Sequence, residues 1–191
     1  MSETRNHVNG SGTNGHGRVR IVVLLLIIVA AAALRIAPHP WNFAPVGAMA
    51  LFSGAMLRDR RLAFGFPLAA MFLSDVVIGF HALMPVVYAS FLLSVGIGSW
   101  LAPSRSLPRI AGATLAGAVQ FFLVTNFAVW LVPGVGSYPK TPAGLLACYV
   151  AGLPYFWNTL ASDAFYVAIL FGGFALAEQQ IPVLRETTAT A

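Results

Sequence analysis

The sequence predicts an all-α protein, an integral membrane helix bundle of six transmembrane helices, and two observations predict this class. Hydrophobic residues make up 58% of the 191 residues and charged residues only 9%, whereas a soluble domain carries about 25% charged residues. A soluble fold leaves about a third of its unfolded surface exposed, and so few charges cannot cover it. The apolar stretches also run for about 20 residues almost without interruption, which favours helices over the short alternating strands of a membrane barrel.

These stretches define the expected domain. Residues 1–17 are rich in Gly and Asn and are expected to form a disordered cytoplasmic tail, residues 18–180 the six-helix domain, and residues 181–191 a short cytoplasmic tail. The first five spans are expected at Val19–Ala37, Trp41–Leu57, Leu62–Phe80, Ala82–Leu101 and Ile110–Val132. The first span also has the basic, apolar and small-residue layout of a secretory signal, so a cleaved leader is the alternative.

The last apolar stretch, Ala143 to Glu178, is too long for one crossing. As one helix its 36 positions would extend about 54 Å. Pro154 offers a break, so we expect a short helix at Ala143–Leu153 on the outer surface and a sixth span at Tyr155–Ala177. With the loop before it, the short helix is expected to form a lid over a pocket; a re-entrant helix and a full crossing are the alternatives.

Lys and Arg fall mainly on one side of the expected spans. With a cytoplasmic N-terminus, the outer side holds two of them, Arg35 and Lys140. The cytoplasmic side holds nine: Arg5, Arg18, Arg20, Arg58, Arg60, Arg61, Arg105, Arg109 and Arg185. Positive charges in short loops stay in the cytoplasm, so this bias predicts cytoplasmic N- and C-termini and a multi-pass protein of the cell inner membrane. The basic clusters are short and scattered, so no nucleic-acid partner is expected.

Polar residues gather at the expected outer ends of the spans. Buried polar groups in hydrocarbon are costly unless they face partners or water, so this distribution predicts a hydrated pocket that opens outward above a dry inner half. The candidate substrate-binding residues are Asp75, His39, Asn42, His81, Asn126, Trp130, Trp157, Asn158 and Asp163.

Several candidates have a structural alternative. Asp75 either contacts a ligand or forms an ion pair, for which Arg35 is the nearest partner by depth. Asn126 suits a hydrogen bond between helices better than a ligand contact. Trp130 and Trp157 line the pocket mouth or belong to an interfacial aromatic belt.

The sixth span carries two polar pairs at i and i+4, which share a helix face. Asn158 pairs with Ser162, and Thr159 with Asp163. Two adjacent polar faces on one helix are hard to explain by packing alone. By contrast, the pair Ala50-x-x-x-Gly54 is typical of close helix contact.

The sequence carries no HExxH, GxSxG, Walker A or dinucleotide-binding motif. The single cysteine, Cys148, excludes an internal disulfide and any cysteine-based metal site. We therefore expect no enzyme, no catalytic residue, no metal and no cofactor.

Five motifs span about residues 20 to 178. They read Arg35-Ile-Ala-Pro-His-Pro-Trp-Asn-Phe-Ala-Pro-Val-Gly-Ala-Met-Ala-Leu-Phe-Ser-Gly, Leu73-Ser-Asp, Val124-Thr-Asn-Phe-Ala-Val-Trp, Tyr138-Pro-Lys-Thr-Pro-Ala-Gly-Leu and Leu153-Pro-Tyr-Phe-Trp-Asn. Together they resemble a bacterial family of uncharacterised polytopic membrane proteins that are labelled as transport proteins. The resemblance implies a class of function and no substrate.

More distantly, the plan is similar to the S components of energy-coupling-factor vitamin transporters. These are six-helix proteins with an outward-facing pocket that dock a separate energising module, often through an Ala-x-x-x-Ala motif in the first helix. Here the nearest match, Ala33-x-x-x-Ala37, lies at the outer end, which departs from that pattern. We expect a membrane protein that binds a small solute for uptake, with the lipid bilayer, a small-molecule substrate and an energising module as partners. The alternative is a non-transporting scaffold subunit or a small lipid-active enzyme.

Overall fold

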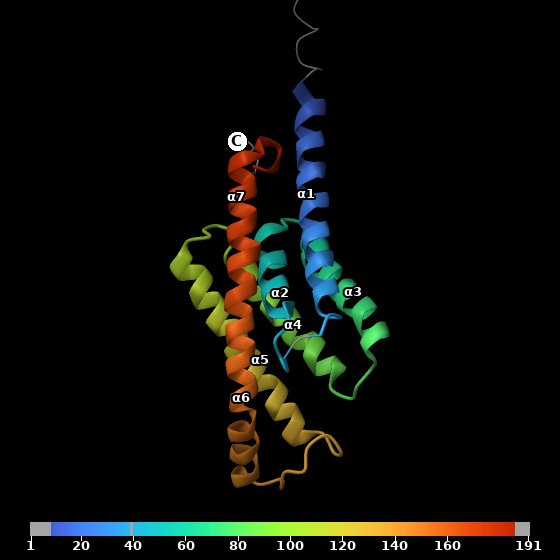
Figure 1. Ribbon diagram of the computed structural model, residues 1–191, viewed down its shortest axis with the longest axis vertical. Helices are drawn as coiled ribbons and strands as arrows, with labels where there is room; N and C mark the ends of the chain where they lie inside the picture. The colour runs from blue at the N-terminus through green and yellow to red at the C-terminus, as the bar shows by residue number, and fades with distance from the viewer. Residues whose placement is uncertain (1–8, 39, 186–191) are drawn as a thin grey trace, which may run out of the picture.

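The described part of the chain is built from helices, which confirms the all-α class. The computed structural model describes residues 9–38 and 40–185, except for the side chains of 9–14 and 16, and these residues form no strand (Figure 1). The helices are α1 (Asn9–Leu34), α2 (Val46–Met56), α3 (Arg60–Ile78), α4 (Met84–Ser99), α5 (Leu107–Leu131), α6 (Pro142–Val167), the π-helical turn η1 (Ala168–Gly172), α7 (Gly173–Gln180) and the 3-10 turn η2 (Pro182–Leu184).

Within residues 9–38 and 40–185, four helical stretches are long and apolar enough to cross a membrane. They are Gly17–Leu34 within α1, α3, α5 and the continuous stretch Pro142–Gln180. The helices α2 and α4 have only 11 and 16 residues, whereas a full crossing needs about 20. The expected spans Trp41–Leu57 and Ala82–Leu101 are therefore longer than the helices found. Residues 41–45 form turns instead, and Asn42 has a positive φ of 58°.

The expected break at Pro154 is wrong. The helix α6 runs through Pro154 and continues through η1 into α7, which gives one helix of 39 residues. A proline inside a membrane helix is tolerated where neighbouring helices and local adjustments satisfy the freed backbone groups. Here α5 packs against α6 beside Pro154, where the ring centroids of Phe122 and Phe156 lie 5.1 Å apart. The segment Ala143–Leu153 is therefore the first part of a long helix rather than a separate one.

The first helix also departs from expectation at its start. It begins at Asn9, inside the segment 1–17 that the sequence predicts to be disordered. Residues 1–8 of that tail, with Arg5, and residues 186–191 of the C-terminal tail lie outside the described residues.

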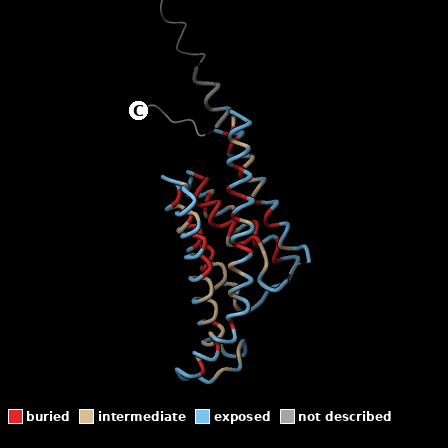
Figure 2. Tube along the Cα trace, turned by 60° about the vertical axis from the view of Figure 1, so that its left-hand side comes forward, coloured by how far each residue is buried: buried red, intermediate tan, exposed pale blue. Residues whose placement is uncertain are grey.

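The centre of the bundle is α2. Ten of its eleven residues are buried, and it contacts α1, α3, α4, α5 and α6. Its packing on α4 is tight, because a Cβ on Gly54 would overlap the carbonyl oxygen of Val95 and one on Gly98 would overlap that of Leu51. The small pair Ala50-x-x-x-Gly54 therefore marks a close helix contact. Figure 2 shows that buried residues gather around this part of the fold.

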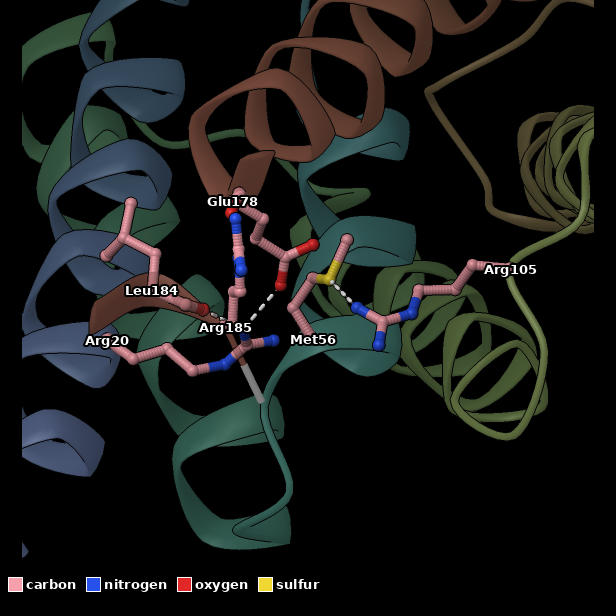
Figure 3. A network of polar contacts seen from close by, with 6 residues as sticks. All are labelled: Arg20, Met56, Arg105, Glu178, Leu184 and Arg185. Atoms are coloured by element: carbon pink, nitrogen blue, oxygen red, sulfur yellow. Dashed lines mark hydrogen bonds and ion pairs between the residues drawn. The ribbon is translucent and has the colours of Figure 1, made fainter. Parts of the chain in front are cut away.

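The first helix and the C-terminal turn meet at one end of the bundle, here called the termini end (Figure 1). Nη1 of Arg20 lies 2.5 Å from Oε1 of Glu178 and also donates to the carbonyl oxygen of Leu184 (Figure 3). The loop between α5 and α6 lies at the other end, here called the hairpin end. An even number of crossings would place both termini on one side of a membrane.

Candidate functional site

A cavity of about 570 Å³ lies next to the start of α2, on its hairpin-end side. Five helices and the loop before α2 contribute to its wall. The lining residues are Arg35, Ile36, Trp41, Asn42, Ala44, Val46, Gly47, Ile78, His81, Val87, Phe91, Ser94, Gly117, Phe121, Thr159 and Asp163. Most are apolar, and the polar groups come from few positions, which is the usual make-up of a small-molecule site.

Irregular backbone forms one wall of this cavity. Within a membrane such backbone is tolerated only where it is buried in protein or lines a water-filled space. The face of α6 that carries Asn158 and Ser162 holds it in place. Nδ2 of Asn158 donates to the carbonyl oxygen of Trp41 at 3.0 Å, and Oγ of Ser162 donates to that of Ala44 at 2.9 Å. This first polar face therefore positions the wall.

The second polar face, with Thr159 and Asp163, lines the cavity itself. The Asp163 carboxylate lies against the N-terminus of α2, where the backbone N–H of Ala48 donates to it. A Cβ on Gly47 would overlap its oxygens, so only glycine leaves room for the carboxylate there. A helix N-terminus stabilises negative charge. A carboxylate offers about four acceptor positions, so Asp163 can bind a further donor from the cavity.

An ion pair supports the opposite wall. Nη1 of Arg35 lies 2.5 Å from Oδ1 of Asp75, whose residue is only 1% exposed, and also donates to Oγ of Ser74 at 2.8 Å. Oη of Tyr88 donates to Oδ2 of Asp75 at 2.5 Å. Asp75 is thus buried behind Arg35, and the guanidinium of Arg35 is the charged group that this wall presents to the cavity.

The floor of the cavity joins α4 to α5. The rings of Phe91 and Phe121 stack with centroids 5.4 Å apart. Next to them, Nε2 of Gln120 donates to Oγ of Ser94 at 2.9 Å and to the carbonyl oxygen of Ser90 at 3.0 Å. Oε1 of Gln120 is buried without a hydrogen-bond partner. Such an unpaired acceptor is costly, and Gln120 itself lies outside the lining of the cavity.

Below the cavity the bundle is closed by aromatic packing. Phe52 of α2 is fully buried and meets Phe171 and Phe174 edge-on, with centroid distances of 5.3 and 5.8 Å. No lining residue of the cavity belongs to η1 or α7. The cavity therefore does not extend into the part of the bundle around Phe52, Phe171 and Phe174.

The structure brings together three of the nine predicted site residues in the lining, namely Asn42, His81 and Asp163. Two more lie directly behind it, Asp75 under Arg35 and Asn158 behind the Trp41 carbonyl. The ion pair between Asp75 and Arg35, which the sequence left as an alternative, is present.

The remaining candidates lie elsewhere or are not described. Nδ2 of Asn126 donates to its own helix at the carbonyl of Phe122. Trp130 lies at the hairpin end, where Nζ of Lys140 is 5.4 Å from its ring centroid. Trp157 is 62% exposed on α6 and lies outside the lining. His39 is outside the described residues.

Sequence reasoning missed most of the apolar lining. Phe91, Phe121 and Val87 look like ordinary core residues of apolar helices, and nothing in the sequence marks them. Ser94 carried a signal, because its hydroxyl recurs four positions after Ser90 on one helix face. Among the described residues no three His, Cys, Asp or Glu side chains come close enough to hold a metal ion.

Residues 16–184 match a family of unknown function (DUF6580), and because the match covers most of the chain, the protein belongs to this family. No curated protein and no solved structure matches the chain.

Proposed function

We propose that this member of the DUF6580 family binds a small solute in the cavity beside α2 and takes part in its uptake. The observation that carries the proposal is the cavity itself, with Asp163 held at the start of α2 inside a largely apolar wall. A buried carboxylate that still faces a space of about 570 Å³ is costly unless a partner or water meets it. Packing alone does not explain why this carboxylate faces a cavity, whereas a bound solute would supply its partner.

The lining indicates the chemistry of the solute. Phe91 and Phe121 offer a flat apolar surface, and Asp163 offers an acceptor with negative charge. The solute is therefore amphipathic, with an aromatic or aliphatic body and an N–H donor or cationic group directed at Asp163. The Arg35 guanidinium, on the opposite wall, suits an acceptor group at the other end of the same molecule.

The charge distribution supports an outward-facing cavity in the inner membrane. Arg18 and Arg20 belong to the part of α1 at the termini end, and Arg185 follows η2 at the same end. Positive charge stays in the cytoplasm, which supports cytoplasmic termini and a cavity on the outer side of α2. The chain has no nucleotide-binding motif, so an ion gradient or a separate energising module, as for S components, would drive uptake.

Native mass spectrometry of the purified protein tests the proposal. We expect a co-purifying small molecule on the unmodified chain, and at least a tenfold lower occupancy on Asp163→Asn, because a hydrogen bond to a charged acceptor contributes about 1.5–3 kcal/mol. Asp59→Asn is the matched control, since Asp59 is an exposed cap of α3 and asparagine caps helices equally well. Equal solute occupancy on Asp163→Asn and Asp59→Asn would contradict solute binding at Asp163. If no small molecule co-purifies with the unmodified chain, the result would contradict solute binding and favour a scaffold.

A further inference from the structure

A second hollow lies between the first half of α5 and the helix formed by α6, η1 and α7. It is an apolar groove of about 640 Å³. On one side it is lined by Leu107, Ala111 and Leu115, and on the other by Ala164, Ala168 and Gly172. All six residues are exposed. In Figure 1 α5 crosses behind α6 and diverges from it toward the termini end, which is where this groove opens.

The groove ends in a polar hollow. Arg105, Ala175 and Glu178 line both the groove and a smaller space of about 450 Å³, which Gln179 and Arg185 complete. Figure 3 shows the Arg105 side chain directed at Sδ of Met56 and the Arg185 side chain beside the end of α7, with the Glu178 side chain between them. Arg185 donates to the carbonyl oxygens of Glu178 and Gln179 at 2.9 Å each. Glu178 is already engaged by Arg20 at 2.5 Å. Arg20, Arg105, Arg185 and Glu178 together carry a net charge of +2 in and beside this hollow.

We propose that the groove binds one anionic phospholipid, with an acyl chain along the apolar part and the phosphate between Arg105 and Arg185. The site has the polarity of such a lipid: an apolar channel that continues into a cationic pocket. Basic pockets between membrane helices are a known way to hold anionic headgroups. The groove is open on the flank of two helices that are long and apolar enough to span a membrane, so a lipid reaches it from the bilayer directly.

Charge complementarity favours a lipid over a second copy of the chain. The whole sequence has only six acidic residues. Of these, Asp75 is paired with Arg35, Glu178 with Arg20, and Asp163 is enclosed at the start of α2. A second copy therefore has little negative charge to offer the arginines. Anionic lipid is abundant beside the cytoplasmic ends of membrane helices.

Small residues keep the groove open. A Cβ on Gly172 would meet nothing within 4 Å, so a larger side chain there would enter the groove without disturbing the fold. The π-helical turn η1 supplies Ala168 and Gly172, and such turns are frequent at functional sites. These residues give a way to block the acyl chain independently of the headgroup.

The test uses the full chain, delipidated in detergent. Palmitoyl-oleoyl phosphatidylglycerol or palmitoyl-oleoyl phosphatidylcholine is added, and native mass spectrometry measures how much of each lipid the protein retains. We expect one phosphatidylglycerol per chain, retained in preference to phosphatidylcholine. Each arginine near an anionic surface is worth about a factor of five in affinity, so Arg105→Gln with Arg185→Gln should weaken retention about 25-fold. The pair Arg60→Gln with Arg61→Gln, exposed at the start of α3, is the matched control and should change little.

A second variant keeps the test decisive, because Arg105 also donates to Sδ of Met56 and its loss can disturb folding. Gly172→Leu should lower phosphatidylglycerol retention at least tenfold, while Gly65→Leu, at another open glycine, should not. Equal retention of the two lipids, or full retention by Gly172→Leu, would overturn the proposal. A dimer that excludes lipid from the groove would overturn it in favour of a second copy.

Discussion

The Arg35 guanidinium lies 2.5 Å from the Asp75 carboxylate and joins the end of α1 to α3. The two residues are 40 positions apart in the chain, and the carboxylate side chain is almost inaccessible, with 1% exposure against 16% for the arginine. Asp75 thus fixes the arginine, and the arginine forms part of the cavity wall. Of the two roles that the sequence allows for Asp75, the structure shows the ion pair with Arg35.

This pair predicts a clear effect of Asp75→Asn on stability. Removing one member of a buried ion pair leaves the other charge without compensation, which costs about 3–5 kcal/mol. We expect a lower thermal midpoint for Asp75→Asn in detergent, measured by the loss of the monodisperse peak in size-exclusion chromatography after heating. The double variant Arg35→Gln with Asp75→Asn should recover part of the loss, because both charges are then absent.

Asparagine keeps the shape of the side chain, so the comparison isolates the charge. A variant Asp75→Asn that is as stable as the unmodified chain but fails to bind solute would show that the carboxylate serves the ligand directly. That outcome would contradict a structural role for the pair.

The contact between α2 and α4 predicts opposite effects for two glycines. Gly54→Ala would place a methyl group against the carbonyl oxygen of Val95, and overpacking of this kind costs about 1–3 kcal/mol or more. Gly96→Ala meets nothing within 4 Å on the exposed side of α4 and should stabilise the helix by about 0.5–1 kcal/mol. Thermal midpoints of the two variants in the same detergent give the comparison. A midpoint for Gly54→Ala at or above that of Gly96→Ala would contradict this packing.

The sequence predicts the helical class well, because a membrane helix needs only length and apolar composition. It fails at the short helices α2 and α4. Hydropathy does not distinguish a short buried helix such as Val46–Met56 from the apolar turn that precedes it. The sequence therefore predicts a single span, Trp41–Leu57, that includes both the turn and the helix. Pro154 misleads for a related reason: its effect depends on whether α5 supports the helix at that level, and sequence spacing does not contain that information.

The candidate site, like the fold, is predicted by the sequence only in part. The i and i+4 spacing of Thr159 and Asp163 predicts one cavity-lining face, and depth along the helices correctly pairs Asp75 with Arg35. Depth alone does not predict which side of a helix faces the cavity, which is why Trp157 is among the candidates although it is exposed on α6 and lies outside the lining. The direction of a side chain follows from the packing of several helices, and no single segment determines it.

The long helix α6 changes what is expected of Cys148. Its residue is 2% exposed, and Sγ lies 3.4 Å from the carbonyl oxygen of Asn126 on α5. A thiol reagent such as N-ethylmaleimide should therefore react slowly with Cys148 in the folded protein. The matched variant, Ala147→Cys with Cys148→Ala, carries its thiol on an exposed neighbouring position and should react at least tenfold faster. Rapid labelling of Cys148 that slows when solute is added would instead support the lid expected over the cavity.

The last prediction concerns the side of the membrane on which each end lies. Arg20 contacts Glu178 and Leu184, so reporters fused before α1 and after Arg185 should report the same side. Because arginine is in excess there, we expect that side to be the cytoplasm. Lys140, in the loop at the hairpin end, should be modified from outside by an impermeant amine reagent in intact cells. The control is Lys140→Arg, which keeps the charge and removes the reactive amine. A C-terminal reporter on the outer side would require an odd number of crossings, and the packing of η2 against α1 would then be wrong.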